Sequence, residues 1–415
     1  MSWLALRLGS AAEAGKAVIQ TGPFGSQLHQ HDYVDDGVPV VMPKDIVGGG
    51  IDESGIAKVG HNKAQELGRH VLDAGDIVFP RRGDIRKCAL ITPQTEGFLC
   101  GTGCLKIRVD RELVLPRFLY YALSSDEVGS WLERRAVGTT MLNLSAGILA
   151  DLELRVPPIE VQAAIVHAAS AYDELIDNNR RRIKLLDDSV RLVFDEWFVR
   201  LRFPGHERLP LVDGLPFGWS RSTVGSVVRS LEDGDWIESK DQGGDDFRIL
   251  QISNIGQNEF RETGNFRYIT EETFRRLRCR EVTPGMILVA RMPMPIGRAM
   301  MLAEMPWRMV TAVDVAIIEP DDEQVDGHYL LYHLNSDANL ARCDALTVGA
   351  TRPRVTRRNL AELPLLIPDK AVQDAFHAVA ADVFAQRVTL FRQIEKLTTA
   401  RDLLLPRLLS GELTI

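Results

Sequence analysis

The stretch with the clearest chemical potential is the acidic segment "EDGDWIESK". Among its residues are the carboxylates Asp233, Asp235 and Glu238 and the lysine Lys240. A metal-dependent nuclease uses clustered carboxylates and a lysine to bind a divalent ion and activate water. This stretch occurs once and is followed by "DQGGDD", a composition typical of an exposed loop. We therefore interpret it as a solvated acidic turn.

Two other groups carry atoms that could bind a metal. Cys100 and Cys104 bracket "CGTGC", but no second Cys or His pair follows at the spacing of a zinc site. His29, His31 and Asp32 lie close together in "HQHD", which resembles an ordinary polar loop. The five cysteines are odd in number and scattered, as expected for reduced, buried thiols. We expect no metal site.

Motifs for methyl transfer or nucleotide hydrolysis do not occur in the chain. An adenine methyltransferase needs a Gly-rich cofactor loop and an Asn/Asp-Pro-Pro-aromatic motif. "VPPI", residues 156–159, has the prolines but neither the polar acceptor nor the aromatic ring. There is no Gly-Lys-Ser/Thr loop for a nucleotide triphosphate. The sequence predicts no catalytic residue and no cofactor.

Composition limits the cellular setting and the partners. The 415 residues, 45% hydrophobic and 26% charged, are typical of a globular chain with two or more cores. No apolar run reaches the roughly 18 residues of a membrane helix, and no signal peptide opens the chain, so we expect a cytoplasmic protein with no membrane partner. The net charge is −8. A protein that holds nucleic acid alone is usually basic, so this chain either binds none or borrows positive charge from partners.

An internal repeat organises the chain. At an offset of 211 residues, "YALSSD" (121–126) falls on "YHLNSD" (332–337), and Leu149, Leu152 and Leu154 fall on leucines of the second half. With a one-residue slip, "GDIVFPR" (75–81) falls on "GMILVAR" (285–291). One register held over so many positions indicates a tandem duplication. The second copy begins near Gly218, after a segment rich in Pro and Gly.

Each copy begins with alternating short strand-like runs and one helical stretch. The runs are "VPVVM", "GDIVF", "CALIT" and "LKIRV" in the first copy, and "FRILQIS", "MILVA" and "DVAIIE" in the second. Residues 117–135 are predicted to form one helix. This mixture predicts a compact α+β domain of about 150 residues in each copy.

Each copy ends in a long amphipathic helix. Apolar residues recur every three or four positions for about 40 residues, which corresponds to roughly 60 Å of helix. Because nothing within one domain is that long, we expect the two helices to pack against each other, antiparallel. Asn179 and Arg387 interrupt the apolar stripes, and such polar groups can set the register. The expected packing residues are Ile165, Tyr172, Leu175, Leu186, Val193, Val379, Leu390 and Leu397.

The predicted fold class is α+β, with two globular domains related by a pseudo-two-fold duplication and joined by two long antiparallel coiled-coil helices. The expected boundaries are 1–156 for the first domain, 157–203 for its helix, 204–217 for a linker, 218–367 for the second domain and 368–412 for the second helix. Two related but unlike domains suit a ligand that repeats along a line, and duplex DNA repeats about every 34–36 Å.

Five segments resemble the specificity subunit of Type I restriction-modification systems. "LGSAAEAGKAVIQTGPFGSQLHQHDYVDDGVPVVMPKDI" is similar to the opening of that family's target-recognition domain. The others, in order, are "VGTTMLNLSAGILADLELRVPPIEVQAAIV", "LVFDEWFVRLRFPG", "LPFGWSRSTVGSVV" and "LLLPRLLSGEL". Two departures occur: Val161-Gln162 replaces the usual Glu-Gln, and the second copy lacks a GPFGS-like loop.

The resemblance implies a non-enzymatic subunit that reads an asymmetric, bipartite sequence of double-stranded DNA. It also implies recruitment of two N6-adenine methyltransferase subunits and, in the full assembly, two ATP-dependent restriction subunits. Those partners would supply much of the positive charge that DNA phosphates require. Two alternatives remain open: a DNA-modifying nuclease or methyltransferase with unrecognised motifs, and a coiled-coil assembly protein, which would not explain the duplicated domains.

Residues expected to contact DNA follow the strand-like runs of each copy. Arginine side chains there could pair with guanine edges or phosphates, while small polar loops allow close backbone approach. In the first copy they are Ser26, Gln27, Lys44, Arg81, Arg82, Arg86 and Lys87. In the second copy they are Ser253, Asn254, Arg291, Arg298, Arg352 and Arg354.

Overall fold

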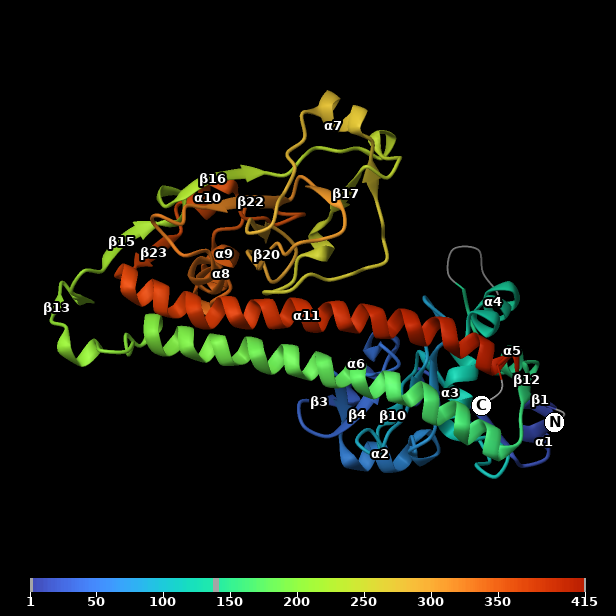
Figure 1. Ribbon diagram of the computed structural model, residues 1–415. Coiled ribbons are helices and arrows are strands. Elements are labelled where there is room, and N and C mark those ends of the chain that lie inside the picture. The colour runs from blue at the N-terminus through green and yellow to red at the C-terminus, as the bar shows by residue number, and fades with distance from the viewer. Residues whose placement is uncertain (1–2, 137–141, 414–415) are drawn as a thin grey trace. The chain divides into compact units, whose positions relative to one another are not determined.

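The computed structural model describes residues 3–136 and 142–413 (Figure 1). Two compact units make up the chain: Met1–Asp177 with Glu395–Ile415, and Asn178–Ile394. Each long helix contributes one part to each unit. Residues 137–141, which open the motif "VGTTMLNLS", lie outside the described residues. Within the described ranges, no helix combines the length and the apolar character that crossing a membrane requires.

The first unit is built on two four-stranded sheets. The larger core lies beneath an antiparallel sheet whose central strands β8 and β11 are buried along most of their length; β8 is apolar throughout, and β11 contains two charged residues, Lys106 and Arg108. Its order is β2 (Ala17–Thr21), β11 (Cys104–Val109), β8 (Ile77–Pro80) and β9 (Ala89–Leu90). The second sheet contains β10 (Leu99–Cys100), β4 (Val38–Val41), β7 (Ala57–Val59) and β3 (Tyr33–Val34), with β10 parallel to β4.

The second unit repeats this topology. Its antiparallel sheet has the order β16 (Val228–Asp233), β22 (Val315–Pro320), β19 (Ile287–Ala290) and β20 (Ala299–Met301). Its second sheet contains β18 (Tyr268–Ile269), β17 (Phe247–Leu250) and β21 (Arg308–Thr311), and β17 is parallel to β21 as β4 is to β10. A two-stranded ribbon closes each domain: β1 (Leu4–Arg7) with β12 (Glu153–Val156), and β15 (Ser220–Thr223) with β23 (Pro364–Ile367). The duplication predicted from sequence is therefore present in the fold.

Two short helices follow the antiparallel sheet in each unit. They are α3 (Pro116–Leu123) and α4 (Asp126–Arg135) in the first unit, and α8 (Gly327–Leu334) and α9 (Asp337–Ala345) in the second. The prediction of one continuous helix over 117–135 is wrong, because Ser125 caps a new helix by accepting a hydrogen bond from the Val128 amide. Ser336 caps α9 in the same way. A shorter helix completes each set, α5 (Ala146–Ala150) and α10 (Arg357–Ala361).

Both long helices begin against their own domain through a buried glutamine. In α6 (Ile159–Phe194), the Gln162 amide accepts from the Leu115 backbone and donates to two backbone carbonyls. In α11 (Lys370–Leu409), Gln373 accepts from the Asp326 backbone and donates to the Pro368 carbonyl. The two glutamines thereby give hydrogen-bond partners to backbone amides and carbonyls that lie next to helix ends and have no partner within a helix. One turn of π-helix, Asp195–Val199, extends α6.

The two helices run side by side and antiparallel (Figure 1). In the first unit Asp173 of α6 pairs with Arg401 of α11 at 2.8 Å, and in the second Asp187 pairs with Arg387 at 2.9 Å. Fourteen residues forward along α6 therefore correspond to fourteen residues backward along α11, which is two heptads of one register. In each unit, a tyrosine of the duplicated domain also donates a hydrogen bond to the aspartate of the ion pair. Tyr121 donates to Asp173 at 2.6 Å, and Tyr332 donates to Asp187 at 3.0 Å.

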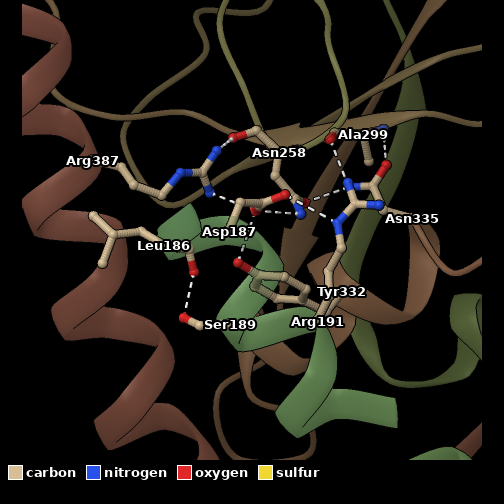
Figure 2. A network of polar contacts seen from close by, with 9 residues as sticks. All are labelled: Leu186, Asp187, Ser189, Arg191, Asn258, Ala299, Tyr332, Asn335 and Arg387. Atoms are coloured by element: carbon tan, nitrogen blue, oxygen red, sulfur yellow. Dashed lines mark hydrogen bonds and ion pairs between the residues drawn. The ribbon is translucent and has the colours of Figure 1, made fainter. Parts of the chain in front are cut away.

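Asp187 lies at the centre of a buried polar network in the second unit (Figure 2). Its Oδ1 accepts hydrogen bonds from Asn258, Tyr332 and Arg387, all at about 3 Å, and its Oδ2 accepts from Arg191. Arg387 also donates to the Asn258 carbonyl. Burial, followed by the nearby Asp187 carboxylate, raises the pKa of Tyr332, so its hydroxyl stays a donor. A buried charge is tolerated when paired and hydrogen-bonded in this way.

The residues expected in the helix seam divide into three groups: buried, partly buried and exposed. Ile165 and Leu390 are buried, and Asn179 is buried and donates to Gln393 at 3.3 Å. The expectation is wrong for Leu175 and Val379, which are 51% and 40% exposed. Tyr172, Leu186, Val193 and Leu397 are partly buried. A step of three or four residues defines a broad stripe, and only packing decides which edge of that stripe faces water.

We predict that Asp187→Ala destabilises the second unit by about 3–5 kcal/mol, because Arg387 would be left buried without its counter-charge. The double variant Asp187→Leu/Arg387→Met should lose less, because both charges are removed together. Calorimetric unfolding of the full chain measures both. Asp188→Ala, an exposed neighbour on the same helix, is the control and should change stability by no more than about 0.5 kcal/mol. Equal losses for the two alanine variants would contradict the network's role.

Candidate nucleic-acid interface

A well-ordered loop, Gly22–Gln27, leaves strand β2 in the first unit. Gly22 donates to the Cys104 carbonyl at 2.9 Å, and a Cβ at this position would lie 1.9 Å from the Gly101 carbonyl oxygen. Only glycine therefore fits where the loop begins. Phe24 and Ser26 are exposed beyond it. The Gln27 carbonyl oxygen accepts from the Phe24 amide, which closes the loop on itself.

Arg69 and His70 connect this loop to the domain. Arg69 donates to Gln27 at 3.3 Å and to the Nε2 atom of the neighbouring His70 at 3.0 Å. Burial, together with the charge of Arg69, lowers the pKa of His70, which keeps the ring neutral and able to accept. No sequence pattern identifies Arg69 as a residue of this site, because it lies 42 residues from Gln27.

Arg81 follows β8 and lies beside the same loop. Its guanidinium carbon is 5.9 Å from the centroid of the Phe24 ring. Two backbone hydrogen bonds hold Arg81 in place: its amide donates to the Gly103 carbonyl, and its carbonyl accepts from the Leu144 amide. The Nε atom of Arg81 is buried without a hydrogen-bond partner among the described residues, and Arg82 is exposed next to it. Of the expected first-copy arginines, Arg81 and Arg82 form no ion pair with a carboxylate within residues 3–136 and 142–413, so both remain suited to an anion or a base edge.

The other cations of the first copy are paired with acids. Arg86 lies 2.8 Å from Asp126, and Lys87 lies 3.3 Å from Asp84. Lys44 is exposed, but its amine lies 2.9 Å from Asp45. Ion pairs at the surface are weak, so these three side chains could exchange partners at little expense.

The second copy uses Arg298 for structure. Its guanidinium is buried and donates to the carbonyls of Ile252, Ile255, Pro293 and Pro295. These hydrogen bonds suit a structural role for Arg298 better than the expected contact with DNA. Five donors in a planar fork make arginine able to hold two loops at once.

Asn254 is likewise turned into the domain. It is buried, accepts from the Gln251 amide and donates to the Arg261 carbonyl, which organises the loop after β17. These contacts likewise suit a structural role for Asn254 better than the expected contact with DNA. Ser253, next to it, is exposed.

Arg291 occupies the position equivalent to Arg81 but has different neighbours. Its carbonyl accepts from the Val355 amide, as that of Arg81 accepts from Leu144. Its guanidinium, however, is buried and lies 2.6 Å from Asp233 and 3.5 Å from Asp314. The two acids neutralise Arg291, so it suits a structural role better than recognition of a base.

Exposed arginines surround the buried Arg291 and its two acids. Arg352 and Arg354 are exposed, and Arg354 lies 3.2 Å from Asp314. Arg229, Arg357 and Arg358 line a hollow of about 710 Å³ next to Arg291. Sequence analysis did not select these three, although the run "TRRN" provides a signal for the last two.

The acidic segment spreads its carboxylates among separate partners. Asp233 pairs with Arg291, and Glu238 pairs with Lys240 at 2.7 Å. Asp235 accepts twice from the Arg280 amide, and desolvation raises its pKa to about 6. Within residues 3–136 and 142–413, no three His, Cys, Asp or Glu side chains are arranged to hold a metal ion.

Cys100 and Cys104 are buried side chains of the first unit. Burial raises the pKa of Cys100 to about 12 and that of Cys104 further, so both are protonated thiols at neutral pH. A protonated, buried thiol is neither a nucleophile nor a metal ligand.

A buried arginine shapes the second copy without any signal in the sequence. Arg248 of β17 donates to both oxygens of Glu262 and lies 4.4 Å from the ring centroid of Trp307 and 4.8 Å from that of Phe266. The first copy has Pro39 at the corresponding point of β4. Equivalent strands of the two copies therefore carry different side chains.

Known proteins are similar to this chain in both sequence and fold. Residues 38–187 match the family model described as "Type I restriction modification DNA specificity domain". The chain is 21% identical over 395 residues to the Type I restriction enzyme MjaIX specificity subunit of Methanocaldococcus jannaschii, across 92% of this chain and 88% of that protein. It is also 21% identical to the putative type I restriction enzyme MjaX specificity subunit of the same organism, across 91% of this chain and 88% of that protein.

The fold is shared with a solved structure, the S subunit of a Type-I restriction-modification system from M. genitalium. The TM-score is 0.54 at 15% sequence identity, with 98% of this chain and 96% of that chain covered. The family model covers part of the first half of the chain, whereas the two relatives are similar to it along most of its length. The chain is therefore similar to the specificity subunits of Type I restriction-modification systems.

Proposed function

We propose that this chain is the DNA-recognition subunit of a Type I restriction-modification complex and has no catalytic activity of its own. It reads an asymmetric, bipartite target, with one half assigned to domain 1–156 and the other to domain 218–367. The relatives it resembles are named specificity subunits. The proposed place of action is the cytoplasm, where bacterial and archaeal DNA is found.

The observation that carries this proposal is the pair Arg81 and Arg291. Both occupy the same backbone position at the end of the equivalent strands β8 and β19. Arg81 lies beside an exposed ring, whereas Arg291 is enclosed by Asp233 and Asp314. One framework that presents unlike groups is what reading two different half-sites requires, because base edges are distinguished by donors and acceptors.

The proposed protein partners are N6-adenine methyltransferase subunits, two per chain, joined by two restriction subunits in the cleaving complex. The helices offer a surface for them. Leu185, Leu192 and Val199 are each about two-thirds exposed and recur every seven residues along α6 and its π-helical turn. A heptad step keeps side chains on one face of a helix, and a row of exposed apolar groups marks an interaction site.

The net charge of the chain supports a division of the DNA contacts between this chain and its partners. At −8 it disfavours independent binding to DNA phosphates. Partners that contact the phosphates would leave this chain only the contacts to base edges.

We predict that selection from random-sequence duplexes yields a split motif with the co-expressed methyltransferase and much weaker enrichment without it, because the partner supplies phosphate contacts. Sequencing of the bound fraction measures this. Nuclease or methyltransferase activity in the purified chain alone would favour the alternative of a DNA-modifying enzyme.

We predict that Arg81→Ala relaxes specificity in one half of that motif and weakens binding by about 1–3 kcal/mol, the usual contribution of an arginine that reads a base. Arg7→Ala is the matched control, since Arg7 is an exposed arginine of the same unit that pairs with Asp151 and is not among the expected DNA contacts. Binding titrations against matched and mismatched duplexes provide the measurement. A uniform loss across all duplexes would mean that Arg81 contacts phosphate instead.

We predict that Leu192→Asp prevents co-purification with the methyltransferase while leaving the thermal midpoint of the chain within a few degrees of wild type. A charge on an exposed apolar face disrupts docking but not the core. Leu211→Asp is the control, because Leu211 is equally exposed but lies outside the helices. Loss of association in both variants would point to general aggregation, and retention in both would remove this face from the interface.

A further inference from the structure

Each unit presents one exposed aromatic ring at the end of the first strand of its antiparallel sheet. Phe24 is 56% exposed and follows β2, and Trp236 is 69% exposed and follows β16. Exposure of a large aromatic ring to water is unfavourable because of the hydrophobic effect. A single exposed ring needs no explanation, but its recurrence at equivalent positions of a duplicated fold does.

The equivalence of the two positions rests on backbone hydrogen bonds. Gly22 donates to the carbonyl of Cys104 at 2.9 Å, and Gly234 donates to that of Val315 at 2.8 Å. Cys104 and Val315 are the first residues of the equivalent central strands β11 and β22. The ring lies two residues after the glycine in both copies.

Steric restriction at the two glycines is also repeated. A Cβ on Gly22 would lie 1.9 Å from the Gly101 carbonyl oxygen, and one on Gly234 would lie 2.2 Å from that of Ala312. Both carbonyls accept from the amide three residues later, at 3.0 Å. The second copy therefore has a counterpart of the GPFGS loop, and the expectation that it lacks one is wrong for the backbone. The counterpart escapes detection because "GDWIE" shares only the glycine with "GPFGS".

The backbone beneath each ring is held firmly. In the first unit Gln27 and Arg69 close the loop, as described above. In the second, the Asp235 amide donates to the Thr311 carbonyl at 3.0 Å, and the Trp236 indole donates to Glu238 at 3.2 Å. The rings are therefore presented on fixed supports, which lowers the entropy lost when they bind.

The charges near the rings permit a polyanionic ligand. In the first unit Arg81 lies over Phe24. In the second, Asp233 pairs with Arg291, Glu238 with Lys240 and Asp241 with Arg276. Asp235, next to Trp236 in the chain, accepts from the Arg280 amide, and burial raises its pKa to about 6.

We propose that Phe24 and Trp236 contact the bases of duplex DNA, each within the half-site of its own domain, by stacking on a base or wedging against a base step. This inference rests on the proposed function. Such a contact accounts for the exchange of Phe for Trp between the copies, because either ring can cover the π-face of a base once its step is partly unstacked. Apolar wedges that partly unstack a base step are an established way for proteins to bind duplex DNA.

The test uses the full chain co-expressed with its methyltransferase, and a duplex selected by the wild-type complex. The variants are Phe24→Ala, Trp236→Ala, and the aromatic exchanges Phe24→Trp and Trp236→Phe. Phe217→Ala is the control, since Phe217 is 62% exposed but occupies neither position. Affinity is titrated, and 2-aminopurine is placed at successive positions of each half-site to report stacking by fluorescence.

We expect each alanine variant to bind about tenfold or more weakly, as loss of one base–aromatic stack usually does. The 2-aminopurine signal should change in one half-site only, a different half for each variant. The aromatic exchanges should retain affinity within about threefold, which shows that the loops remain folded, and Phe217→Ala should match wild type.

Three results would overturn the inference. Alanine variants that bind the selected duplex as tightly as wild type would remove the rings from the DNA contact. Variants that keep affinity for DNA but lose the methyltransferase would assign the rings to a protein interface. If the wild-type complex enriches no duplex at all, the proposed function fails and this inference fails with it.

Discussion

The antiparallel pairing of α6 with α11 is the constraint on which the structure depends. Asp173 with Arg401, and Asp187 with Arg387, keep one register two heptads apart. A slip by one residue would leave the buried pair Asp187 and Arg387 without its partners, at several kcal/mol for each ion. Because Tyr121 and Tyr332 reach the same two carboxylates, each recognition domain is attached to the helix pair at the point where the register is set.

Duplication then supplies two domains with one framework. Strand order, the single parallel pair and the serine caps recur in both. The surfaces differ because side chains outside the ladder are free to change: Arg81 faces a ring, whereas Arg291 faces two acids. A framework held by backbone hydrogen bonds tolerates such exchange, since the bonds do not depend on side-chain identity.

The sequence predicted the helix pair well and the contact residues less well. Asn179 and Arg387 were identified as seam interruptions because a polar residue on an apolar stripe is visible in one chain. Arg298 and Asn254 were placed at the surface, because loop position alone suggested exposure. Their partners are backbone carbonyls and amides of the same folded loops, and no spacing rule reveals these contacts.

The sequence by itself determined the duplication, the α+β class and the long helices, since periodicity and internal similarity are properties of the chain. Tertiary structure alone decided which cations are free and which are neutralised, and that Gly234 begins a loop equivalent to that of Gly22. The physical reason is that charge pairing and steric fit act between atoms close in space. Gly22 meets a carbonyl 79 residues away, at Gly101, and Gly234 meets one 78 residues away, at Ala312.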